Sequence, residues 1–191
     1  MPIPLGVLAV AGAGAAPVPA GNAYEWLETV SVGSGGQASV SFSNLNSTYG
    51  STYQHLQVRI TFKGETANTE SLRMRLNSDT GSNYNIHAVL GDGSAVSSFG
   101  LANQVWMTIG DSKNTANAFT GAIVDVLDAF ETTKFKTIRV LSGTSEAVTR
   151  VDLASGAWRN TNAITDMSFF MNSGTDIAQF SRISLYGMRS G

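Results

Sequence analysis

Apolar and polar residues alternate twice along residues 71–91, once in each half of the stretch. The apolar positions in the two halves of this stretch are Leu72, Met74 and Leu76, then Tyr84, Ile86, Ala88 and Leu90. A period of two is typical of a strand with one buried face. Residues 77–83, NSDTGSN, separate the halves and are rich in side chains that favour turns. The pattern predicts a β-hairpin with one apolar and one polar face.

The same period of two recurs along the rest of the chain, from residue 24 onward. Strands are predicted over residues 24–32, 38–42, 55–62, 104–110, 119–127, 134–142, 148–158, 166–172 and 179–188. Clusters of Thr, Asn, Ser and Gly separate them at roughly the 8–12-residue spacing of sandwiches and barrels. We therefore expect an all-β fold, an antiparallel β-sandwich of about ten strands with jelly-roll-like connections.

Composition agrees with one domain whose surface carries few charges. The 191 residues are 42% hydrophobic but only 14% charged, against about 25% in ordinary domains. A net charge of −2 provides no basic surface for phosphates and argues against nucleic-acid binding. The chain has no cysteine, which excludes disulfides and thiolate metal sites. Few surface charges would permit close subunit contacts, so we expect a homo-oligomer, with a trimer favoured.

The first charged residue is Glu25, and residues 1–22 differ in composition from everything that follows. We divide the chain into an extended apolar N-terminal arm, residues 1–22, and a sandwich domain, residues 23–191. The arm lacks the basic start of a signal peptide, and its glycines and prolines argue against a membrane-spanning helix. A disordered tail and an atypical export signal remain alternatives. Burial on a partner would instead remove its apolar side chains from water, and the predicted docking residues are Ile3, Leu5, Val7, Leu8 and Val10.

The histidines and acidic residues do not predict catalysis. His55 begins a strand and His87 lies on the polar side of another, so both are predicted at the surface or an interface. No nucleophile elbow, phosphate-binding loop or zinc-binding helix motif is present. Asp125, Asp128 and Glu131 could suggest a glycosidase pair. Their spacing of three predicts one solvated helical turn flanked by Lys134 instead.

The turn at residues 77–83 carries oxygen ligands at alternate positions, which resembles part of a calcium loop. The positions concerned are Asn77, Asp79, Gly81 and Asn83. No glutamate follows at the twelfth position and no helix flanks the turn, so an EF-hand is not predicted. The expectation is a polar turn, and we predict no metal ion and no cofactor.

Aromatic side chains offer a second kind of recognition surface, because their faces suit the apolar faces of sugars. The candidates are Trp26, Trp106, Trp158, Tyr49, Tyr53 and Tyr84. Trp106 and Trp158 lie within strand patterns and are predicted to pack in the core. Tyr49 and Tyr53 lie in a predicted loop and are the better candidates for surface recognition.

Several segments together resemble a family of small virion structural proteins of tailed bacteriophages, of the marine and cyanobacterial type. They are MPIPLGVLAVAGAGAA, YQHLQVRI, LRMRLNSDTGSNYNIHAVLGDGS, FTGAIVDVLDAFETTKFKTIRVLSG, SGAWRNTNAITDMSFF and FSRISLYGMRSG. They occur in order over most of the chain. None is a catalytic signature, and the resemblance lies in their combination.

The resemblance implies a non-enzymatic protein on the surface of the phage particle. The arm would dock on another virion protein of the tail or capsid, and the sandwich would face outward. We expect a tail-associated fibre or receptor-binding subunit. The alternatives are a capsid decoration protein that stabilises the head, or a carbohydrate-binding module that recognises host surface glycans.

Overall fold

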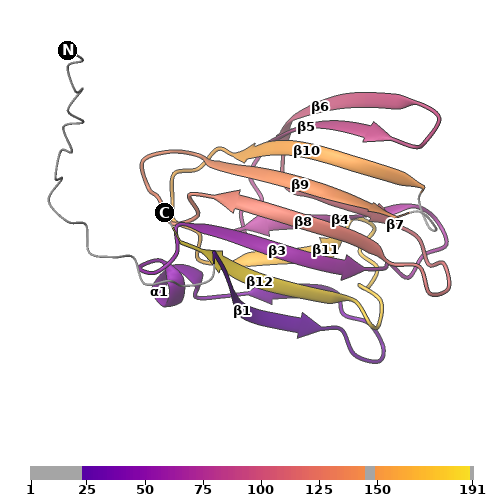
Figure 1. The fold of residues 1–191 in the computed structure, drawn as a ribbon, viewed down its shortest axis with the longest axis horizontal. Coiled ribbons are helices and arrows are strands. Elements are labelled where there is room, and N and C mark those ends of the chain that lie inside the picture. The colour runs from indigo at the N-terminus through magenta and orange to yellow at the C-terminus, as the bar shows by residue number, and fades with distance from the viewer. Residues whose placement is uncertain (1–22, 145–148, 190–191) are drawn as a thin grey trace, which may run out of the picture.

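The computed structural model describes residues 23–144 and 149–189, so the predicted arm lies outside the described residues. Two antiparallel sheets form a sandwich (Figure 1). In spatial order, the eight-stranded sheet contains β1 (Tyr24–Ser31), β12 (Arg182–Met188), β3 (His55–Phe62), β8 (Thr120–Leu127), β9 (Lys136–Thr144), β10 (Arg150–Trp158), β5 (Tyr84–Gly91) and β6 (Val96–Gln104). The four-stranded sheet contains β2 (Ser39–Phe42), β11 (Met167–Met171), β4 (Glu70–Leu76) and β7 (Met107–Ser112).

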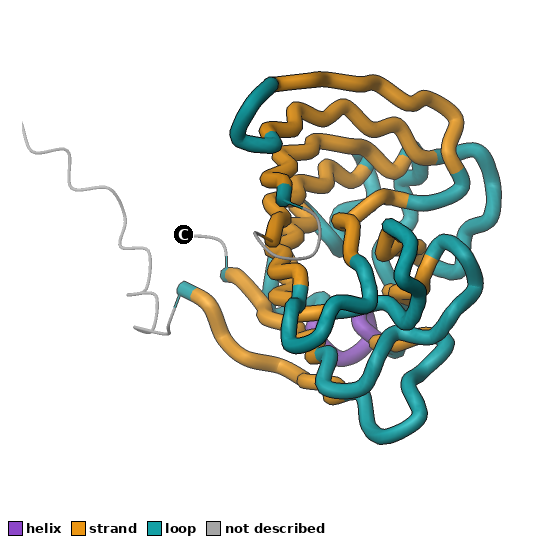
Figure 2. The backbone as a smooth tube through the Cα atoms, turned by 90° about the vertical axis from the view of Figure 1, so that its right-hand side faces the viewer, coloured by secondary structure: helices purple, strands orange, loops and turns teal. Residues whose placement is uncertain are grey.

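The chain passes repeatedly from one sheet to the other. It leaves the larger sheet after β1, β3, β6 and β10, and each time enters the smaller sheet for a single strand before it returns. Figure 2 shows the two layers from the side. Neighbouring strands pair antiparallel throughout both sheets. The prediction of an all-β antiparallel sandwich is confirmed, and its connections are jelly-roll-like.

The alternating side chains meet between the two sheets and form one core. Along β3 the apolar positions Leu56, Val58, Ile60 and Phe62 are all buried. On the neighbouring strands β2 and β11 of the smaller sheet, the buried rings of Phe42 and Phe169 pack edge to face with centroids 6.4 Å apart. Most strands therefore turn one side into the sandwich, as the period of two predicts.

The predicted hairpin at residues 71–91 is wrong. Strand β4 pairs with β11 and β7 in the smaller sheet, whereas β5 pairs with β10 and β6 in the larger one. Asn77 and Ser78 adopt left-handed backbone conformations, with φ of 51° and 52°. The Asn77 side chain also donates to the Ala163 carbonyl and accepts from the Thr165 amide. The turn thus carries the chain between sheets, since alternation determines which face is buried but not which strand pairs with which.

Two elements were not predicted. Helix α1 (Leu45–Tyr49) lies within a predicted loop, and only Leu45 in it is buried. Strand β6 has almost no buried residue and forms the sheet edge beside β5, so no alternation marks it. Within the described residues, no helix has the length and apolar character needed to cross a membrane.

Candidate functional site

The outer face of the eight-stranded sheet, turned away from the smaller sheet, presents a group of adjoining aliphatic side chains. Strand pairing aligns Ile123 with Leu141, Leu141 with Leu153, and Leu153 with Val89, across four neighbouring strands. Two further valines lie on the same face one row away, toward β6. The six side chains are between 41% and 77% exposed, and we call them the aliphatic patch: Val89, Val96, Ile123, Leu141, Val151 and Leu153.

Beside the patch, glycines replace side chains along the next row of the same face. Pairing places Gly121 opposite Gly143, and Val151 between Gly143 and Gly91. We call Gly91, Gly121 and Gly143 the glycine row. Because these positions carry no Cβ, they help to line a shallow hollow of about 1030 Å³, which Ile123 and Leu141 also border. An extended peptide backbone could approach the sheet closely there.

On the other side of the patch runs a row of polar side chains, which we call the polar row. Gln57 donates to the Asp125 carboxylate at 2.8 Å, and its own carbonyl accepts from Arg59 at 2.9 Å. From Asp125 on β8, strand pairing extends the row across β9 and β10 to β5, the neighbour of β6. Its five members are Gln57, Asp125, Arg139, Ser155 and His87. As predicted, His87 lies on the exposed side of its strand.

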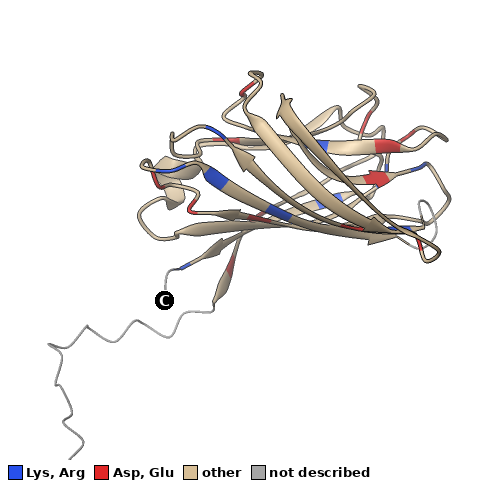
Figure 3. Ribbon diagram, turned by 90° about the horizontal axis from the view of Figure 1, so that it is seen from above, with Lys and Arg blue, Asp and Glu red and all other residues tan. Residues whose placement is uncertain are grey.

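Near β1 the same face carries a cation held between two aromatic rings. The Arg59 guanidinium lies 4.5 Å from the ring centre of Tyr186 and 5.5 Å from that of Tyr24. Trp26 on β1 is 61% exposed, and its indole N–H donates to the Thr29 hydroxyl. The outer face therefore offers an apolar area bordered by polar and aromatic groups. Figure 3 shows how thinly charged residues are spread over the strands.

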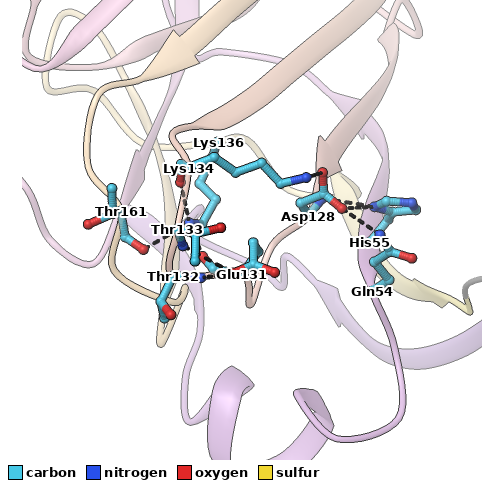
Figure 4. Close-up of polar contacts among 9 residues, drawn as sticks. All are labelled: Gln54, His55, Asp128, Glu131, Thr132, Thr133, Lys134, Lys136 and Thr161. Atoms are coloured by element: carbon cyan, nitrogen blue, oxygen red, sulfur yellow. Dashed lines mark hydrogen bonds and ion pairs between the residues drawn. The ribbon is translucent and has the colours of Figure 1, made fainter.

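Asp128, the middle residue of the three acidic positions considered above, stabilises the turn that follows β8 (Figure 4). Asp128 accepts from the Gln54 amide at 2.6 Å and pairs with Lys134 at 2.7 Å. Its backbone N–H donates to Nδ1 of His55, so that nitrogen acts as an acceptor. The hydrogen bond from Lys134 lowers the pKa of Asp128 and outweighs the opposing effect of burial. These contacts join the start of β3 to the end of β8.

The predicted helical turn over residues 125–131 is wrong. Strand β8 continues to Leu127, and Asp128 then takes a left-handed conformation with φ of 51°. Asp125 belongs to the outer face, whereas Glu131 accepts from the backbone of Thr132 and Thr133. The three carboxylates are divided between a strand and a turn, and each has partners of its own.

The side-chain oxygens of Asn77 and Asp79 in the turn at residues 77–83 accept hydrogen bonds from other groups of the protein. The Asp79 carboxylate accepts from the Trp158 indole at 2.6 Å, from Asn83 at 2.9 Å and from the Gly81 amide at 2.8 Å. Over residues 23–144 and 149–189, no group of three or more histidine or acidic side chains is arranged to hold a metal ion. These contacts make the segment a structural turn that covers the end of the core.

The predicted surface exposure of the loop tyrosines is wrong. Tyr53 is only 7% exposed, and Tyr49 lies half-buried against the core in α1. Their rings pack edge to face with centroids 6.2 Å apart. Trp158 is fully buried, as predicted, whereas Trp106 is half-buried beneath the Arg73 guanidinium.

The aliphatic patch was not identified from the sequence, although a signal for it exists. Three strands of the larger sheet carry apolar residues on both faces. The adjacent pairs are Ile123–Val124, Val140–Leu141 and Leu153–Ala154, in which Ile123, Leu141 and Leu153 are the large outward members. In a sandwich only one face of each sheet is covered, so large apolar residues on both faces indicate a second contact surface.

Comparisons with known proteins find little that resembles this chain. No protein-family model matches it. No curated protein matches its sequence. Among solved structures, it resembles the marine PL-14 alginate lyase from Aplysia kurodai over 74% of this chain and 71% of that one. The TM-score is 0.34 and the sequence identity 8%.

Proposed function

We propose that this protein is a non-enzymatic structural subunit of a bacteriophage particle, and that the outer face of its larger sheet is an assembly surface. The observation that carries the proposal is the aliphatic patch. Its six side chains point away from the core, so they are not required to hold the two sheets together. Large contiguous apolar patches on proteins mark sites of interaction with other macromolecules.

The sequence resemblance supports the virion setting, and the two apolar features of the chain support assembly. A tail-associated fibre or receptor-binding subunit is the form we propose first, attached to another virion protein through the arm. A capsid decoration protein is the alternative, and electron microscopy of labelled particles distinguishes tail from head.

Attachment can be measured by co-sedimentation with purified particles that lack the protein. We expect the unmodified chain to attach. The double substitution Leu141→Gln/Leu153→Gln should weaken attachment at least about tenfold, since it makes the centre of the patch polar. Leu5→Gln/Leu8→Gln in the arm should have a similar effect.

The matched control is Phe135→Gln, because Phe135 is exposed to a similar extent but lies in a loop outside the outer face. This variant should attach like the unmodified chain. Circular dichroism would establish that all variants are folded. Normal attachment by the folded patch variant would contradict the assembly role of the outer face.

A carbohydrate-binding module is the second candidate, and the groups at the β1 end of the outer face favour it. Trp26 offers an exposed ring there, and Arg59, Arg139 and Arg182 are exposed cations on the same face. Such groups suit a glycan that carries carboxylates.

A glycan array that includes acidic polysaccharides tests this second candidate. We expect Trp26→Ala to reduce binding about tenfold and Phe135→Ala to leave it unchanged. Absence of binding by the unmodified protein would remove this candidate.

A further inference from the structure

We propose that residues 3–10 of the arm of one copy occupy the hollow along the aliphatic patch of a second copy of this chain. The inference rests on the proposed function and deepens it, because it names the occupant of the same surface. The arm then joins copies of this chain, and the arm of a terminal copy is the one that attaches to another virion protein. It stands on the chemistry of the arm, the shape of the hollow and the place where the arm joins the sheet.

The arm and the patch match in chemical character. Residues 3–10, IPLGVLAV, carry no charge and no polar side chain. In an extended backbone Ile3, Leu5 and Val7 project to the same side. The hollow offers aliphatic side chains to receive them, at Ile123 and Leu141, and two members of the glycine row, Gly91 and Gly121, face open space that leaves room for the backbone itself.

The position of β1 favours a neighbouring copy over the arm's own sheet. Tyr24 pairs with Met188, which pairs with His55, so β1 begins in the row beyond the polar row. To reach its own patch, the arm would have to reverse direction and cross side chains that include Asp125 and Arg139. Covering charged groups with apolar chain is unfavourable. The arm of another copy can enter from the side of the glycine row, where Asp92 and Arg182 border the hollow, without crossing Asp125 and Arg139.

The arm is long enough for this exchange. Residues 11–23 separate the apolar segment from β1 and can span up to about 43 Å when extended. The larger sheet, with seven inter-strand spacings of about 4.8 Å, is about 34 Å wide. Residues 11–23, when extended, are therefore longer than the larger sheet is wide, so the apolar segment can reach the hollow of a neighbouring copy. The arm of one copy would contact the sheet of the next, so the two sides of the interface differ. Such a heterologous interface joins successive copies into a closed ring or an open chain.

Because the chain has no cysteine, the contact can be tested by disulfide trapping in the full-length protein. One chain would carry Val7→Cys, and a second, with a tag of distinct mass, would carry Leu141→Cys, at a position that borders the hollow. After mixing and mild oxidation, we expect a disulfide-linked pair of one tagged and one untagged chain. A tagged Ser34→Cys chain is the control, since Ser34 is exposed in the turn between β1 and β2.

Light scattering supplies an independent measurement. We expect the unmodified protein to self-associate, and Leu141→Gln/Leu153→Gln to weaken this association at least about tenfold. Trapping no greater than with Ser34→Cys would overturn the inference, as would an unmodified protein that stays monomeric. A chain carrying both Val7→Cys and Leu141→Cys that links only within itself would overturn it in favour of the arm's own sheet.

The inference and the proposed function can fail separately. If disulfides form between copies but the protein does not co-sediment with particles, the exchange of arms is supported and the virion role is contradicted. Attachment that survives in a strictly monomeric protein would retain the virion role and remove the exchanged arm.

Discussion

Trp158→Ala is expected to lower the free energy of unfolding by about 3–5 kcal/mol, because it leaves a large cavity in the core. Trp158 is fully buried at the end of β10. Its neighbours across the sheet are Tyr84 on β5 and Lys136 on β9, which are also buried. The substitution also removes the indole donor that binds Asp79. Urea denaturation followed by far-ultraviolet circular dichroism measures the loss.

Trp26→Ala is the matched control, because Trp26 is mostly exposed on the edge strand β1. We expect this variant to lose less than about 1 kcal/mol. Equal losses for the two tryptophan variants would contradict the central packing role of Trp158.

The Asp79 contact adds a pH dependence to the same region. Burial raises the pKa of the Asp79 carboxyl, but hydrogen bonds from Trp158, Asn83 and Gly81 together lower it below its ordinary value of 3.8. The ionised carboxylate therefore stabilises the fold above that value, and the contribution is lost as pH falls through the lowered pKa. Asp79→Asn should cost about 1 kcal/mol at neutral pH and little in strong acid.

Lys136→Met is expected to lower the free energy of unfolding by about 2–4 kcal/mol, because it removes the donor that three carbonyl groups share. The Lys136 ammonium is fully buried at the start of β9. It donates to the carbonyl oxygens of Glu131, Lys134 and Thr161, three acceptors for its three N–H bonds (Figure 4). Burial lowers the pKa of this amine, and the carbonyls offset the cost of its charge.

Lys134→Met makes the same chemical change two residues away. Lys134 is exposed and pairs with Asp128 at the surface. Exposed ion pairs contribute about 0–1 kcal/mol, so this variant should remain close to the unmodified protein in urea. If Lys136→Met were no more destabilising than Lys134→Met, the buried amine would not hold the loop and β9 together.

Lys136 also marks a limit of prediction from sequence. In the pattern of residues 134–142 it is one polar residue at the start of a strand, and nothing local indicates that its amine is buried. Its burial depends on carbonyl groups of two separate segments, at residues 131–134 and at Thr161. Strand pairing brings these segments together, and pairing is not encoded in the period of two.

Tyr49 and Tyr53 show the same limit for the candidate site. Turn-forming neighbours placed them in a loop, and loops are usually exposed. In the structure the segment is tied down by α1 and by Gly187 on β12, whose backbone leaves space for the Tyr53 ring. A distant glycine thus makes room for a ring that the local sequence places at the surface.

The class of fold and the buried face of most strands can be predicted from the sequence, because alternation is a local property of the chain. The tertiary structure decided that β4 and β5 belong to different sheets, since pairing depends on contacts between distant segments. It also decided that Ile123, Leu141 and Leu153 form one surface. Each is a single exposed residue along the chain, and only the register of three neighbouring strands places them side by side.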